Sequence, residues 1–360
     1  MSAIAIFDQV CKTYDGISQV VDHLDLTVQE GEFLSLLGPS GSGKTTTLMM
    51  LAGFETPTSG DIRLAGRSLR AVPAHKRDIG MVFQNYALFP HMTVGENIAF
   101  PLQVRKVGRS EQARRVKLAL DIVQLSHAAQ RLPAQLSGGQ QQRVAVARAL
   151  VFEPKLVLMD EPLGALDKNL REQMQFEIRQ LHRRLGVTMV YVTHDQAEAL
   201  TMSDRIAVFH EGKIQQLCGP REIYEQPSSA FIATFVGESN CLPGTVESLD
   251  RGIAVLCTDG GSRLRAIAGG GLAVGCKGLF TLRPERADLA TAKTTDGVGV
   301  IAVLEEAIFV GDKMRARLRT SDGHEMIACG NPDQFDMLPA PGSQICVTWR
   351  TTHARIFVAP

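Results

Sequence analysis

The chain has 360 residues, which is long enough for two or three domains with sizeable buried cores. Its composition is 44% hydrophobic and 21% charged, as in an ordinary globular protein. The 38 basic and 38 acidic residues cancel to a formal net charge of +0, so no basic surplus indicates a nucleic-acid partner. The seven cysteines form no C-x-x-C pair, which argues against a zinc site and favours a reducing compartment.

The N-terminal stretch does not have the character of a targeting segment. Residues Met1 to Tyr14 carry Asp8 and Lys12 within an apolar stretch, which is not typical of a signal peptide. No apolar run approaches the ~20 residues that a helix needs to span a bilayer. If the protein works at a membrane, we therefore expect another chain to cross it.

Up to about Phe235, short apolar runs alternate with helical patterns. Three runs have the length and composition of buried strands: Phe33 to Leu37, Leu156 to Met159 and Thr188 to Thr193. Between the last two, apolar residues recur at helical spacing from Leu170 to Leu185. Buried strands that alternate with helices predict an α/β domain with a largely parallel sheet.

After Asn240 the pattern changes to short β-rich runs separated by glycine and proline. We expect strands at Ile253 to Cys257, Leu279 to Leu282, Gly299 to Val303, Met326 to Cys329 and Ile345 to Trp349. Such runs predict a small all-β domain, a sandwich or a barrel. The stretch from Pro220 to Phe235 is the predicted helical linker between the two parts.

A glycine-rich loop follows the first predicted strand and precedes an apolar helical segment. We name Gly38, Pro39, Ser40, Gly41, Ser42, Gly43, Lys44 and Thr45 the phosphate loop, because they fit the pattern G-x-x-x-x-G-K-[ST]. Glycines let backbone N–H groups face an anion, and the helix N-terminus adds a positive dipole end. Lys44 is predicted to reach the β- and γ-phosphates of a bound nucleotide, and the Thr45 hydroxyl to bind Mg²⁺. Thr46, the next residue, is also counted among the predicted nucleotide-binding residues. Kinases, GTPases and motors share this motif.

Two acids end the strand predicted at Leu156 to Met159. A strand end beside a phosphate loop is where an α/β sheet holds its ligands. Asp160 is predicted to hold Mg²⁺ through water, and Glu161 to polarise the attacking water as general base. By itself, the pair could equally be solvated acids at the end of a strand.

A second glycine motif precedes an alanine-rich helix that begins near Val144. With this motif the sequence resembles the ATP-binding-cassette (ABC) family, whose signature consists here of Leu136, Ser137, Gly138, Gly139 and Gln140. Ser137 and Gly139 lie at the predicted helix N-terminus, which forms a second anion site. The resemblance implies that this site grips the γ-phosphate of ATP bound to the other subunit of a homodimer.

Four further positions match the family residue by residue. The resemblance implies that Tyr14 stacks on adenine, Gln84 contacts Mg²⁺ and the attacking water, and His194 bonds the γ-phosphate. The segment from Gly164 to Asp167 resembles the loop that crosses the dimer interface in the family, with Gly164 at a position where serine is common. Tyr14 has the alternative of a half-buried strand tyrosine, and a lone histidine is usually structural.

The resemblance also implies an architecture and a metal set. The fold is that of a P-loop NTPase cassette with an inserted helical subdomain at about residues 88–131. The expected domains are an ATPase domain at 1–238 and a β-rich transport-associated (TOBE) domain of OB type at 239–360. Mg²⁺ is expected at Thr45, Gln84 and Asp160.

The implied function is that of the ATP-hydrolysing subunit of a bacterial-type importer. Its expected partners are integral membrane permease subunits and an external solute-binding protein, with no nucleic acid. Its expected place is the cytoplasmic face of the inner membrane, as a peripheral subunit. Residues 84–90, with Tyr86 and Phe89, are the predicted coupling surface for the permease, unless these aromatics pack the subdomain core.

Two alternatives to an importer are weighed against the sequence. ATPases of translation or repair usually carry two cassettes, coiled coils or zinc motifs, which this sequence lacks. A non-catalytic module is disfavoured because the predicted catalytic residues are all present: Lys44, Asp160, Glu161 and His194. The solute is less defined: Phe235 to Asn240 is similar to the domain junction of polyamine (spermidine/putrescine) import ATPases, while ferric iron, phosphonate and sugar remain open.

Overall fold

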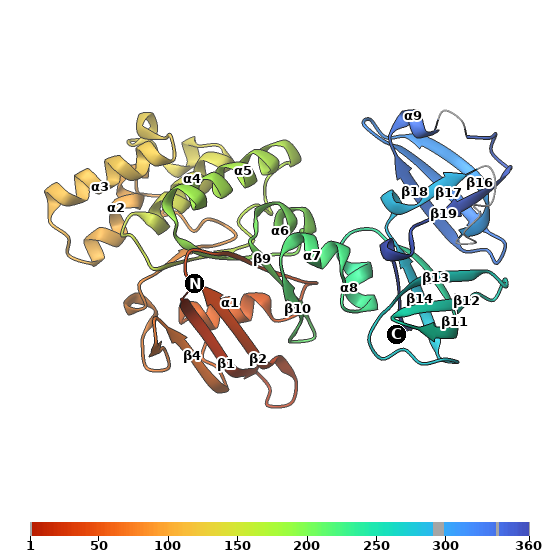
Figure 1. Ribbon diagram of the computed structural model, residues 1–360. Helices are drawn as coiled ribbons and strands as arrows, with labels where there is room; N and C mark the ends of the chain where they lie inside the picture. The colour runs from red at the N-terminus through yellow and green to blue at the C-terminus, as the bar shows by residue number, and fades with distance from the viewer. Residues whose placement is uncertain (1, 291–298, 336–337, 360) are drawn as a thin grey trace. The chain divides into compact units, whose positions relative to one another are not determined.

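The protein is described here by a computed structural model that covers residues 2–290, 299–335 and 338–359. It divides into two compact units, Met1–Pro220 and Arg221–Pro360 (Figure 1). The sequence-based boundary, between residues 238 and 239, lies beyond two short helices that group with the second unit: α7 (Pro220–Glu225) and α8 (Ala230–Phe235). None of the described helices is long and apolar enough to cross a membrane.

A six-stranded sheet with the order β10-β9-β3-β8-β7-β6 forms the centre of the first unit. Its parallel members are β3 (Phe33–Leu37), β6 (Ile79–Val82), β7 (Leu156–Asp160), β8 (Thr188–Thr193) and β9 (Arg205–His210). The edge strand β10 (Lys213–Cys218) is antiparallel. Every residue of β3, β7 and β8 is buried, and the parallel pairing of the strands confirms the predicted α/β domain with a largely parallel sheet.

Alternate residues of these strands enter two different cores, because strand side chains point to opposite faces in turn. Leu34, Leu158 and Val192 join one core together with helix α1 (Lys44–Ala52). Met159 and Tyr191 join the other, beside helix α5 (Lys168–Leu185). Helix α6 (Gln196–Met202) follows β8 and contacts α5.

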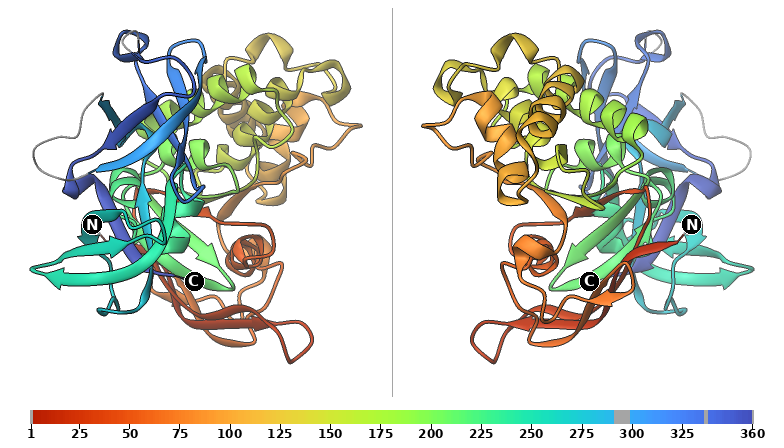
Figure 2. Two further views of the ribbon diagram at one scale, coloured as in Figure 1. Left: turned by 90° about the vertical axis from the view of Figure 1, so that its right-hand side faces the viewer. Right: turned by 90° about the vertical axis from the view of Figure 1, so that its left-hand side faces the viewer.

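An antiparallel sheet with the order β2-β1-β4-β5 covers the α1 side of the central sheet. Its strands are β1 (Ala3–Thr13), β2 (Gln19–Gln29), β4 (Ser59–Leu64) and β5 (Arg67–Ser68). Within the first unit it lies at the end opposite to helices α2 and α3 (Figures 1 and 2).

Those helices form a subdomain with a hydrophobic core of its own, built around Ile98, Leu120 and Val144. It consists of α2 (Val94–Val104), α3 (Arg109–Ile122) and α4 (Gly138–Leu150). The 3-10 turns of the first unit are η1 (Ala74–Lys76), η2 (Ser126–Ala128) and η3 (Pro133–Gln135).

The second unit is built of strands around one core, which confirms the predicted all-β C-terminal region. A closed barrel has the order β11-β12-β13-β20-β14: β11 (Asn240–Asp250), β12 (Ile253–Cys257), β13 (Arg263–Ala268), β14 (Lys277–Leu282) and β20 (Ala354–Val358). A second sheet has the order β15-β19-β16-β17-β18: β15 (Asp288–Ala290), β16 (Gly299–Phe309), β17 (Met314–Thr320), β18 (Glu325–Gly330) and β19 (Gln344–Thr348). Short turns complete it: η4 (Pro284–Arg286), α9 (Pro332–Phe335) and η5 (Thr351–His353).

A buried arginine joins the helices of the second unit to its barrel. Arg283, directly after β14, donates hydrogen bonds to the carbonyl oxygens of Tyr224 (3.0 Å), Ala233 (3.0 Å) and Glu238 (3.1 Å). It also donates to Ser239 Oγ (2.8 Å). Without this guanidinium, several buried acceptors would lose their partner, which is more costly than the loss of an exposed contact.

Replacement of this arginine is expected to destabilise the second unit selectively. Arg283→Met should lower its free energy of unfolding by about 3 kcal/mol, because buried carbonyls are left without donors. Trp349, the single tryptophan of the chain, is buried against Phe280 and reports on this unit by its fluorescence. Arg263→Met is the matched control, since Arg263 pairs with Glu247 at the surface. Equal denaturation midpoints for the two variants would contradict the assignment.

Candidate nucleotide and catalytic site

The phosphate loop follows the last residue of β3, Leu37, and continues into the first turn of α1, which begins at Lys44. Gly41 and Gly43 have φ values of +79° and +98°, which favour glycine. A Cβ atom on Gly43 would lie 2.5 Å from Val20 O, and one on Gly38 would lie 2.4 Å from Phe209 O. The loop therefore takes its path because glycine alone fits against the neighbouring backbone.

Lys44 is buried at the centre of this loop. Its Nζ donates to Pro39 O (2.8 Å) and is 3.4 Å from Ser42 Oγ. Burial lowers the pKa of Lys44 from its ordinary value, and the nearby charges of Glu161 and Asp160 oppose this shift. A bound anion would supply the negative charge that compensates the desolvation of this ammonium group.

Thr45 and Asp160 meet across the start of α1 and the end of β7. Thr45 Oγ1 donates to Asp160 Oδ1 at 3.1 Å. Burial raises the pKa of Asp160, an effect that the Thr45 hydrogen bond and Lys44 partly offset. The two side chains offer oxygen donors only, the type that Mg²⁺ prefers.

Three predicted catalytic side chains converge just beyond this pair. Glu161 Oε1 lies 3.0 Å from His194 Nδ1, and Glu161 Oε2 accepts from Gln84 Nε2 at 3.4 Å. Glu161 has a φ of +43°, a strained conformation for a non-glycine residue, and its N–H donates to Val192 O at 3.0 Å. The structure thus brings together residues that are far apart in the sequence.

Tyr14 directly follows Thr13, the last residue of β1. Its side chain is 61% exposed, and Lys12 Nζ lies 4.7 Å from the ring centroid. It is therefore not the half-buried strand tyrosine considered as the alternative. The next residue, Asp15, accepts from the N–H groups of Ile17 and Ser18, which lower its pKa to about 2 and hold the turn that follows.

The signature residues lie at the N-terminus of α4. Ser137 caps this helix in a reciprocal arrangement with Gln140, while the Ser137 and Gly138 positions remain exposed. Gly139 packs against Leu170: a Cβ atom added to Gly139 would lie 3.0 Å from Leu170 Cδ1. Among the described hydrogen bonds and ion pairs, none joins Leu136–Gln140 to the phosphate loop of the same chain.

Asp167, the predicted interface residue, caps the neighbouring helix α5 by accepting from Leu170 N at 3.0 Å. Arg171, which sequence reasoning missed, donates to Leu166 O (3.0 Å) beside it and to Asp195 Oδ2 (3.2 Å) beside His194. It therefore joins the Asp167 loop to the His194 turn.

Sequence reasoning also missed Glu198, a nearly fully buried carboxylate behind the His194 turn. It accepts from Tyr191 Oη (2.7 Å) and Thr193 Oγ1 (2.6 Å), and burial raises its pKa. The available signal was the spacing Asp195-x-x-Glu198, which is typical of a capped helix start. These contacts hold the turn that presents His194.

The predicted coupling surface divides into a buried and an exposed part. Tyr86 is buried in the core beside α4, so it cannot serve as a surface anchor. Phe89 lines an open groove of about 380 Å³ instead, together with Phe83, which directly precedes the predicted segment, and with Phe100 and Phe152. Phe89 packs on Phe100 with ring centroids 4.7 Å apart.

A strand, a phosphate loop, a buried lysine and two strand-end acids in this arrangement define a P-loop nucleoside triphosphatase. The sequence model described as "ABC transporter" matches residues 21–164, and the TOBE domain model matches residues 280–357. Curated relatives extend the match over nearly the whole chain. One is the "Spermidine/putrescine import ATP-binding protein PotA" of Rubrobacter xylanophilus, 49% identical over 93% of this chain and 89% of that protein.

The protein of the same name from Acidothermus cellulolyticus is 47% identical over 98% of this chain and 92% of that protein. Among solved structures, the chain is similar to cbiO1 of Clostridium perfringens, with a TM-score of 0.58 and 27% identity over 62% of this chain and 91% of that one. It is also similar to a dimeric ATP-binding cassette bound to ADP and Pi, with a TM-score of 0.55 and 34% identity over 61% of this chain and 99% of that one. The chain belongs to the ABC transporter family and is an ATPase of that type.

Loss of the buried ammonium group is expected to abolish nucleotide binding. Lys44→Ala removes the one cation that the loop holds against an anion, so affinity for a fluorescent ATP analogue should fall at least ~100-fold. Lys155→Ala, at an exposed position before β7, is the control and should bind as the wild type does. Unchanged affinity in Lys44→Ala, with an intact circular dichroism spectrum, would mean that the phosphate loop is misassigned.

Proposed function

We propose that this chain hydrolyses MgATP as a homodimer to drive polyamine uptake, of the spermidine/putrescine class, through a membrane permease. The observation that carries the catalytic part is the convergence of Gln84, Glu161 and His194 beside Lys44 and the Thr45–Asp160 pair. The polyamine part rests on relatives named as spermidine/putrescine import ATP-binding proteins, which are 42–49% identical over most of the chain.

In the proposed reaction, Glu161 accepts a proton from the attacking water, and Gln84 orients that water through the amide that contacts Glu161. His194 holds Glu161 from the other side and donates to the γ-phosphate when ATP is bound. Lys44 stabilises the charge that builds on the transferred phosphoryl group. Tyr14 offers an exposed ring on which adenine stacks.

The donor set fits a magnesium ion. Thr45 Oγ1 and Asp160 Oδ1 are 3.1 Å apart. The side-chain amide of Gln84 uses its nitrogen to contact Glu161, and its oxygen is the third proposed donor. These three oxygens are the proposed ligands, directly or through water. When bound, Mg²⁺ would neutralise charge on the β- and γ-phosphates.

The exposed signature supports a shared site. Ser137 and Gly138 present a helix N-terminus to solvent, with no described link to the phosphate loop of their own chain. We propose that this end completes the site of a second copy, as the family resemblance implies. Two chains then enclose two ATP molecules, with each Asp167 loop at the interface between them.

The open groove lined by Phe83 and Phe89 is the proposed contact for the permease. Residues 85–89 follow Gln84 directly in the chain and lead to Phe89 in this groove, before helix α2 of the helical subdomain begins. Arg148 holds that stretch by donating to the carbonyl oxygens of Tyr86 (2.8 Å) and Ala87 (2.7 Å). This stretch is the proposed path by which a shift at Gln84 reaches the groove.

The remaining parts of the proposal concern the assembly. Residues 1–238 would form the functional ATPase domain, and residues 239–360 its TOBE-type companion. The chain would lie peripherally on the cytoplasmic face of the inner membrane, where an external solute-binding protein delivers polyamine to the permease. Ferric iron, phosphonate and sugar are the alternative solutes.

Removal of the proposed general base is expected to separate binding from hydrolysis. Glu161→Gln should bind MgATP with near wild-type affinity but hydrolyse it ~10²–10⁴-fold more slowly, because the water is no longer deprotonated. It should also accumulate as an ATP-bound dimer in size-exclusion chromatography. Glu222→Gln, on the surface of α7, is the control and should turn over normally. Near wild-type turnover in Glu161→Gln would overturn the assignment.

The solute is tested with the complete transport complex. In vesicles that contain this chain and the permease of its transport complex, with the solute-binding protein supplied outside, spermidine should stimulate ATP hydrolysis and labelled spermidine should accumulate. Glu161→Gln complexes should do neither. Stimulation and uptake with ferric iron, a phosphonate or a sugar, and not with spermidine or putrescine, would replace the polyamine proposal while leaving the ATPase proposal intact.

A further inference from the structure

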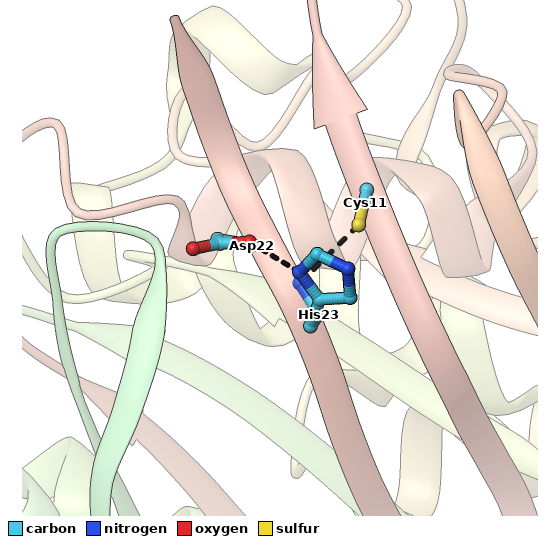
Figure 3. Close-up of side chains that lie close together, drawn as sticks. All are labelled: Cys11, Asp22 and His23. Atoms are coloured by element: carbon cyan, nitrogen blue, oxygen red, sulfur yellow. Dashed lines mark hydrogen bonds and ion pairs between the residues drawn. The ribbon is translucent and has the colours of Figure 1, made fainter.

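Three side chains with metal-binding atoms come together on the first two strands, away from the catalytic carboxylates. They are Cys11 on β1 and Asp22 and His23 on β2 (Figure 3). One thiol sulfur, one carboxylate oxygen and one imidazole nitrogen all lie within 4.8 Å of one another. None of these residues has a part in the proposed hydrolysis of ATP.

A β-bulge produces this cluster. Val10 pairs with Leu24 and Lys12 pairs with Val21, so the single residue Cys11 faces two residues of β2. In a regular strand, adjacent side chains would point to opposite faces. The bulge, with His23 at a φ of +47°, turns its side chain toward that of Asp22 instead.

The local contacts orient the three ligand atoms. His23 N–H donates to Cys11 Sγ at 3.3 Å, which holds the sulfur against the bulge. His23 Nδ1 and Asp22 Oδ1 lie 2.5 Å apart. Lys213, on β10, pairs with the other oxygen, Asp22 Oδ2, at 2.9 Å and so fixes the plane of the carboxylate. A charged partner on the outer oxygen of a ligand is a common supporting feature of metal sites.

We propose that Cys11, Asp22 and His23 bind one transition-metal ion of the Zn²⁺ class, with a fourth position left to solvent. Sulfur and nitrogen donors select borderline-soft ions, and three protein ligands with one open position are a usual zinc arrangement. The same donor set disfavours Mg²⁺, which requires oxygen ligands. Cys11 is a free thiol, and the His23 side chain is 64% exposed, which gives the ion a path of entry.

Zinc-class ions bind a cysteine as its thiolate, so the proton of the Cys11 thiol passes to solvent when the metal binds. The groups that face the imidazole ring are Asp22 on its own strand, Cys11 on β1 and, through Asp22, Lys213 on β10.

The test uses the full chain, free of nucleotide, and titrates it with Co²⁺ as a spectroscopic substitute for zinc. The wild type should bind one Co²⁺ with a thiolate-to-metal charge-transfer band, which Zn²⁺ removes and Mg²⁺ does not. Cys11→Ser should abolish the band, and His23→Ala and Asp22→Asn should each weaken binding at least ~10-fold. His23 is exposed, so its variant should remain folded even if Cys11→Ser does not.

Matched controls come from the same residue types elsewhere in the chain. Cys276→Ser and His127→Ala remove a free cysteine and an exposed histidine, and both should bind Co²⁺ as the wild type does. The proposal is overturned if the wild type gives no charge-transfer band. It is also overturned if the band survives in Cys11→Ser, or if the control variants weaken binding as much as the site variants do.

Discussion

The parallel alignment of the central strands is the constraint on which the whole site depends. Because β3, β6, β7 and β8 run in one direction, the segments that follow them all begin at the same edge of the sheet. The phosphate loop, Gln84, the Asp160–Glu161 pair and His194 are those segments. Because β3, β7 and β8 are fully buried, this edge is well fixed, and residues as far apart in the sequence as Thr45 and Asp160, 115 positions, meet within hydrogen-bonding distance.

The same burial sets the electrostatics of the site. It lowers the pKa of Lys44 and raises that of Asp160, two shifts with one cause and opposite signs. Both groups are partly desolvated, and the opposite charge of each compensates only part of the desolvation cost of the other. A phosphate chain and a divalent cation would complete the compensation, so ligand binding is expected to stabilise this edge of the fold.

Much of this could be predicted from the sequence because it depends on short patterns. The bounds of β3 and β8 agree with the predicted runs, and the phosphate loop was defined by its glycines and Lys44. Other features depend on contacts that no local pattern encodes. The burial of Tyr86 follows from the packing of α4 against the central sheet, and the Arg171 contacts join two distant turns. The bulge at His23 depends on strand register, and the catalytic roles stay predictions.

Arg171 has a consequence for how two copies of the chain would work together. One end of its guanidinium holds the carbonyl beside the Asp167 loop, and the other holds Asp195 beside His194. In the proposed dimer, the first loop faces the neighbouring copy while the histidine faces the chain's own ATP. Because one side chain links both segments, closure at one nucleotide would change the surface offered to the other. Hydrolysis at the two centres would then be cooperative, with a Hill coefficient above one that falls toward one when the link is cut.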